Sequence, residues 1–115
     1  MSNFKVKRID SKEHREFVIQ NPCIVTGYLG EYLVPHHLLR VESVKGTGTK
    51  SCDMWCVPLH STIHDMLHKN GNERVFFINN GRSYEWVIGH ACALALRSPD
   101  VRIVNKMKQW ECDNG

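Results

Sequence analysis

Histidines are the residues whose type and spacing could most clearly do chemistry in this sequence. Five of the seven lie between residues 36 and 68. His60, His64 and His68 recur every four residues, so on a helix each is rotated by only about 40° from the one before and all project from one flank. Imidazoles at positions i and i+4 of a helix commonly hold a divalent metal ion, with further ligands from another element. The spacing therefore predicts a metal site on a helix.

The His36-His37 pair is the nearest source of a further ligand. Neighbouring residues of a strand point to opposite sides of a sheet, so both cannot easily bind one ion. We therefore expect one histidine of the pair to bind the metal and the other to have a different role. Residue type and spacing leave open which is which.

Two strands and a helix must position these histidines. An extended segment over residues 28–39 is predicted to form the first strand of a hairpin. The glycine-rich residues 42–51 favour a loop, and the aromatic and β-branched residues 54–59 predict the return strand. From His60 the pattern is helical, with Asn70-Gly71 as the stop. The apolar stripe of this helix is Ile63, Met66 and Leu67.

Further helices are expected on both sides of this unit. Ser11 and Ser83 are typical N-caps and predict helices over residues 12–19 and 83–96, and Asn72 is expected to cap a turn over residues 73–78. The sequence thus predicts a single α+β domain over 1–115, with a motif core at about 22–70 and a helical C-terminal extension over 72–98. Residues 101–110 give no clear pattern. The large apolar residues expected in the core are Met66, Leu67, Phe76, Phe77, Trp86 and Leu94.

The order of the histidines resembles the HNH, or ββα-metal, endonucleases. A histidine pair, a hairpin loop, a second strand and a helix with H-x-x-x-H is similar to the colicin DNase form of this motif. The resemblance implies that His36, His64 and His68 bind one divalent metal ion and that His37 is the general base. Asp53 is the polar residue nearest the place of the family's asparagine and is expected to orient the base.

Two narrower resemblances lie within the same region. G-T-G-T-K-x-x-D at residues 46–53 is similar to small prophage-encoded HNH proteins. W-x-V-P-L at residues 55–59 resembles the Ref-like nucleases, which act with recombinase filaments. These resemblances imply DNA as a partner, and a recombinase filament or another phage recombination protein as a second one.

Metal-dependent hydrolysis of DNA phosphodiester bonds is the activity that the resemblance implies. One ion of Zn, Mg, Mn or Ni is expected, and imidazole ligands favour Zn, Ni or Mn over Mg. Arg40 is expected to clamp the scissile phosphate and Lys50 to contact the DNA backbone. The alternative is a nucleic-acid-binding module that keeps the ββα-metal fold without cleaving. A peptidase of the HExxH type would need a glutamate where Asp65 follows His64.

Composition and charge are compatible with this interpretation. Fifteen Lys and Arg against twelve Asp and Glu give a net charge of +3, which permits nucleic-acid binding. Five cysteines without C-x-x-C pairing are expected to be thiols. No apolar stretch approaches the roughly 20 residues of a membrane span, and no signal peptide precedes the domain. A cytoplasmic location in a bacterial or phage-infected cell is therefore expected.

Overall fold

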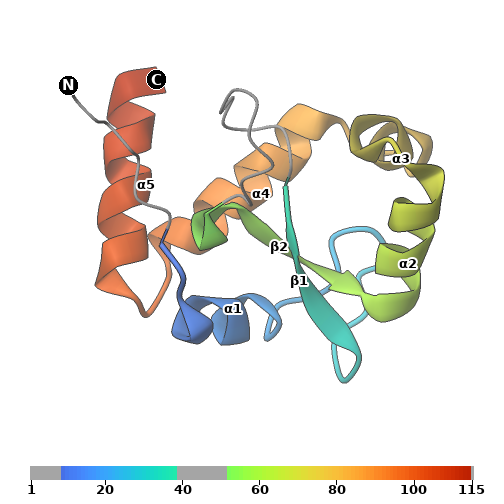
Figure 1. Cartoon of the computed structure of the whole chain (residues 1–115), viewed down its shortest axis with the longest axis horizontal. Helices are drawn as coiled ribbons and strands as arrows, with labels where there is room; N and C mark the ends of the chain where they lie inside the picture. Colours follow the sequence, from blue (N-terminus) through green and yellow to red (C-terminus); the bar gives the residue numbers. More distant parts are fainter. Residues whose placement is uncertain (1–8, 39–51, 115) are drawn as a thin grey trace.

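The computed structural model describes residues 9–38 and 52–114. The hairpin crosses the middle of the molecule, with α2 and α3 at one end and α5 at the other (Figure 1). This arrangement confirms the predicted single α+β domain. In chain order the elements are α1 (Lys12–Val18), β1 (Leu33–His37), the 3₁₀ turn η1 (Asp53–Trp55), β2 (Cys56–His60), α2 (Ser61–Asn70), α3 (Glu73–Asn79), α4 (Tyr84–Leu96) and α5 (Val101–Asn114).

The two strands pair antiparallel, in a register that separates the neighbouring histidines. His36 lies opposite Val57, and His37 lies opposite Cys56. Because side chains alternate along a strand, the two imidazoles point to opposite faces of the hairpin. His36 faces α2, and His37 faces the side on which η1 lies.

Two prolines face each other at the centre of the hairpin. Pro35 pairs with Pro58. Proline has no N–H to donate, so this pair fits a position at which the strands exchange no hydrogen bonds. The outward carbonyl of Pro58 accepts a hydrogen bond from the Ile24 amide at 3.1 Å. This contact holds the loop of residues 21–27 against the edge of β2.

The helix ends follow the capping residues of the sequence. The side chains of Ser11, Asn72 and Ser83 each accept a hydrogen bond from a backbone amide in the first turn of the following helix. Helix α2 ends at Gly71, whose φ of 80° lies in the left-handed region that glycine adopts at least cost. These predicted caps are confirmed.

Both strands are shorter than the sequence predicts. β1 begins only at Leu33, because Tyr32 has a φ of 70° that interrupts an extended chain. The sequence predicts a second strand from residue 54, but residues 53–55 wind into η1 and β2 starts at Cys56. Helix α5 follows the predicted extension and covers the residues for which the pattern gave no prediction.

The core lies between α4, η1 and the hairpin. Trp55 is fully buried and packs edge-on against Trp110 of α5, with ring centroids 4.9 Å apart. Helix α4 buries Val87, Ala91 and Ala95, which lie on one face at a spacing of four. The predicted core is confirmed for Leu67, Phe76, Phe77 and Leu94, but wrong for Met66 and Trp86, which are 49% and 38% exposed.

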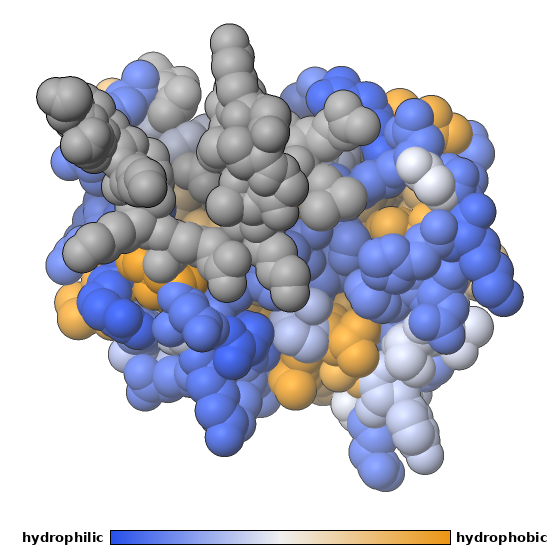
Figure 2. Space-filling model, in the orientation of Figure 1, coloured by the Kyte–Doolittle hydropathy of each residue, from blue (hydrophilic) through white to orange (hydrophobic). Residues whose placement is uncertain are grey.

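The face of the molecule drawn in Figure 2 is mostly hydrophilic and carries separate hydrophobic patches. Exposed apolar side chains include Tyr28, Leu29 and Tyr32 in the segment before β1. Across the two described ranges, no helix has the length and apolar character needed to cross a membrane.

A buried polar network joins α1 to the start of α5. His14 has no exposed surface, and its Nδ1 lies 2.8 Å from the Ser98 hydroxyl. The Ser11 hydroxyl donates to Asp100 Oδ2 at 2.6 Å. Burial lowers the pKa of His14 to about 4, although the charges of Asp53 and Asp100 oppose this shift. His14 is therefore neutral in the folded protein at neutral pH.

We predict that His14 makes the fold less stable in weak acid. The unfolded histidine gains its proton near pH 6.5 and the folded one only near pH 4, so stability falls as the pH is lowered through this window. His14→Asn keeps a hydrogen-bonding group near Ser98 and removes this titration. Urea unfolding at pH 7 and at about pH 4.5 should therefore show a smaller loss in the variant than in the wild type. An equal loss in both proteins would contradict the assignment.

Candidate metal centre

Three histidines meet between β1 and α2. His36 comes from β1, and His64 and His68 lie one turn apart on α2. One nitrogen of each ring lies within 4.8 Å of the other two. The closest pair is Nε2 of His64 and Nε2 of His68, at 3.1 Å. His36 is buried, whereas His68 is exposed. The triad is therefore buried at its β1 end and open to solvent on its α2 side.

The donor set fits a divalent metal ion. Imidazole nitrogens bound at 2.0–2.1 Å in a tetrahedral zinc site lie roughly 3.3 Å from one another, which matches the closest pair in the triad. Burial lowers the pKa of His64, and the neighbouring His36 and His68 lower it further. The neutral imidazole is the form that binds a metal. Three protein ligands also leave a coordination position for water or substrate, as in catalytic zinc sites.

A buried carboxylate holds His36 in place. His36 Nε2 donates a hydrogen bond to Glu73 Oε1 at 2.5 Å, and the Tyr84 hydroxyl donates to Glu73 Oε2. With Nε2 carrying the proton, Nδ1 of His36 keeps its lone pair for a ligand. Carboxylates that fix the tautomer of a metal-binding histidine in this way are common in metal sites.

No pattern in the sequence indicates that Glu73 contacts His36. It lies just after the N-cap of α3, where an acidic residue is ordinary because it interacts favourably with the helix dipole. No spacing along the chain relates Glu73 to His36. The carboxylate reaches the imidazole because α2 packs on β1 and α3 packs on α2, and a pattern along the chain does not reveal such packing.

His37 makes a separate pair with Asp53. Its Nε2 donates to Asp53 Oδ1 at 2.6 Å, and its side chain is 32% exposed. Because Nε2 carries the proton, Nδ1 is left as a proton acceptor. The structure thus brings together the two residues that the sequence predicts as base and orienting group, and it places them apart from the triad on the other face of β1.

Helix α1 fixes the Asp53 carboxylate. Its Oδ2 accepts hydrogen bonds from the Ser11 amide at 2.6 Å and from Arg15 Nη1 at 2.5 Å. Burial alone would raise the pKa of Asp53, but the hydrogen bonds from His37, Ser11 and Arg15 outweigh burial and lower it. Asp53 is therefore a stable anion. No pattern in the sequence relates Arg15 to Asp53, because 38 residues separate them.

Cys56 lies beside this pair. Ligand atoms of His37, Asp53 and Cys56 lie within 4.8 Å of one another, which is close enough for an ion. However, burial raises the pKa of the Cys56 thiol, and the Asp53 charge raises it further. A metal ligand must be the thiolate. Without an ion, these three groups therefore form a hydrogen-bonded His37–Asp53 pair beside a neutral thiol.

His60 shares the four-residue spacing of His64 and His68 but is not part of the triad. It is the last residue of β2 and the N-cap of α2, where its Nδ1 accepts a hydrogen bond from the Thr62 amide at 3.1 Å. Its ring packs against Tyr28 and Tyr32. The predicted DNA contacts Arg40 and Lys50 lie outside the described residues.

Comparison with known proteins places the chain in a family. Residues 1–98 match a family model described as protein of unknown function (DUF968). The chain belongs to the DUF968 family. No curated protein and no solved structure gives a significant match to it. The part of this DUF968 protein that matches includes the hairpin, both histidine groups and α2 to α4, and it stops before α5.

We predict that Glu73→Gln weakens metal binding. The amide keeps the size of the carboxylate but loses the charge that makes His36 a stronger ligand, so zinc affinity measured by calorimetry should fall roughly 10- to 100-fold. Glu85→Gln, an exposed change in the first turn of α4, is the matched control and should bind zinc like the wild type. An unchanged affinity in a Glu73→Gln protein that still unfolds cooperatively would argue against the role of Glu73.

Proposed function

We propose that this protein is a metal-dependent endonuclease that hydrolyses DNA phosphodiester bonds. The observation that carries the proposal is the pairing of His37 with Asp53 at 2.6 Å, one residue along β1 from the His36 triad. A proton acceptor and a metal-binding group thus belong to one hairpin-and-helix unit. The strand, strand and helix order of this unit resembles the HNH endonucleases.

His37 acts as the general base in this proposal. A water molecule that attacks phosphorus must lose a proton near neutral pH, which suits an imidazole with a free nitrogen. Asp53 keeps Nε2 protonated, so Nδ1 is the accepting atom. The fixed carboxylate also stabilises the imidazolium that forms when the proton is taken, as the aspartate of a catalytic triad does.

His36, His64 and His68 would hold the ion on the other face of β1. When bound, a divalent ion would supply positive charge for the phosphate oxygens and the leaving oxygen as the bond breaks. The imidazole ligands favour Zn, Ni or Mn over Mg. Glu73 and Tyr84 keep His36 oriented toward the other two histidines.

We predict that a variant of the proposed base and a variant of a proposed metal ligand have different effects on metal affinity. His37→Ala removes the proton acceptor and leaves the triad complete, so nicking of supercoiled plasmid should fall about 10²- to 10⁴-fold with metal affinity close to wild type. His64→Ala deletes a ligand and should reduce metal affinity and nicking together. His60→Asn is the control, since asparagine also caps a helix and His60 is outside the triad.

Several outcomes would contradict these assignments. Loss of metal binding in His37→Ala would show that His37 is the metal ligand, so that the proposed roles of His36 and His37 would have to be exchanged. Full nicking by His37→Ala would remove the general base from the proposal. A wild-type protein that binds DNA but nicks plasmid with none of Zn, Ni, Mn or Mg would favour the binding module without cleavage.

A further inference from the structure

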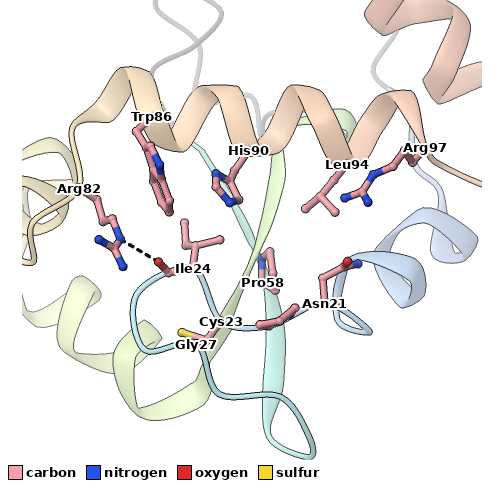
Figure 3. A pocket seen from close by; sticks show the side chains of 11 residues that line it. Asn21, Cys23, Ile24, Gly27, Pro58, Arg82, Trp86, His90, Leu94 and Arg97 are labelled. Atoms are coloured by element: carbon pink, nitrogen blue, oxygen red, sulfur yellow. Dashed lines mark hydrogen bonds between the residues drawn. The ribbon is translucent and has the colours of Figure 1, made fainter.

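A hollow of about 310 Å³ lies between α4 and the loop of residues 21–27 (Figure 3). We call it the α4 groove. Pro58 of β2 lies at its floor, and Pro58 shares a face of the hairpin with Cys56 and His37 because the three occupy alternating and paired positions. The α4 groove therefore lies on the His37 side of the hairpin. Trp86, His90 and Leu94 of α4 line one wall, with Arg82 just before the helix and Arg97 at its C-cap.

The α4 groove is positively charged. Arg82 and Arg97 line its two ends, and none of the ion pairs among the described residues uses either of them. No carboxylate from the described part of the chain lines it. The terminal nitrogens of both guanidinium groups are therefore available for an anion, and nothing acidic in the lining competes for them.

Arg82 is held in a fixed position. Its Nε donates to the Ile24 carbonyl at 3.1 Å, and its guanidinium lies over the Trp86 ring, 4.7 Å from the centroid. His90 packs on Trp86 with centroids 4.0 Å apart. This stack explains why a tryptophan expected in the core is at the surface. Trp86 is part of the wall of the α4 groove, and its ring helps to hold the Arg82 guanidinium in place.

The spacing of the two arginines favours a chain of anions over a single one. The 13 residues of α4 lie between them, a length of about 20 Å. One phosphate or carboxylate can meet only one end, whereas a nucleic-acid strand carries a phosphate at every nucleotide. Between the ends lie His90 and Leu94, a ring and an apolar side chain that suit a base or a sugar. Alternating cations and rings are typical of single-strand binding surfaces.

We propose that the α4 groove binds a single strand of nucleic acid, with phosphates at Arg82 and Arg97 and a base packed against His90. The proposal deepens the proposed function and rests on it for the choice of a nucleic acid over another polyanion. The hollow admits a nucleoside-sized group but is too small for a duplex.

The test is fluorescence anisotropy with a labelled single-stranded oligonucleotide in EDTA, so that no cleavage occurs. Arg82→Gln/Arg97→Gln should bind at least tenfold more weakly. The slope of log affinity against log salt should become less steep by about 1.4, because each lost phosphate contact contributes about 0.7 for single strands. Lys12→Gln/Lys108→Gln removes two charges from exposed sites on α1 and α5 and should bind like the wild type.

If the double variant unfolds because the Arg82 contact with Ile24 is lost, the single variant Arg97→Gln is tested instead. Arg97 is exposed, and its single loss should change the salt slope by about 0.7. Wild-type affinity in the arginine variants, or equal weakening in the lysine control, would overturn the proposal. Tighter, arginine-dependent binding of a labelled poly-glutamate peptide would overturn it in favour of an acidic protein partner.

A plasmid-nicking assay on the same proteins tests the proposed endonuclease activity separately from binding in the α4 groove. A wild-type protein that nicks but binds the oligonucleotide independently of the arginines overturns the α4 groove alone. A protein that binds through the arginines and nicks with none of the four metals overturns only the endonuclease and supports the α4 groove.

Discussion

The pairing of β1 with β2 is the constraint on which the candidate site depends. Because neighbouring residues alternate, this register alone turns His36 toward α2 and His37 toward η1. A slip of one residue would exchange the two faces and separate His36 from the helix histidines. The Pro35–Pro58 pair opposes such a slip, because any shift by one residue puts one proline where the ladder needs an N–H. The prolines thus help to fix which histidine has which neighbours.

Two buried carboxylates from outside the strands then set the chemistry of the two histidines. Glu73 and Asp53 each accept a hydrogen bond from an Nε2–H, which leaves Nδ1 as the open atom of His36 and of His37. A buried carboxylate is costly unless other groups also donate to it. Tyr84 does so for Glu73, and the Ser11 amide and Arg15 do so for Asp53. The two histidines nevertheless differ in their surroundings, because the His36 ring lies beside His64 and His68, whereas His37 lies beside Cys56.

The sequence was informative where the chemistry is local. The i, i+4 spacing of His64 and His68, the strand alternation at His36-His37 and the helix caps are all set by residues close in the chain, and the structure brings these groups together as expected. Periodicity does not separate the end of β2 from the start of α2, so the four-residue spacing assigns His60 to a helix that it only caps. The partners Glu73 and Arg15 lie 37 and 38 residues from the groups they contact, and such pairs depend on how whole helices pack.

Helix α4 connects the candidate metal centre with the α4 groove. Its first residue, Tyr84, supports Glu73, and its buried face packs on η1 and β2. Leu94, which lines the groove, also packs against Cys56, the residue paired with His37. Because one helix carries these contacts, core packing rather than a loop sets the position of the groove relative to His37. A strand lying along α4 would run on the same face of the hairpin as His37, so the geometry of the groove is compatible with delivery of a phosphodiester to that side. The two proposals nevertheless rest on different residues, and neither set of contacts depends on the other being occupied.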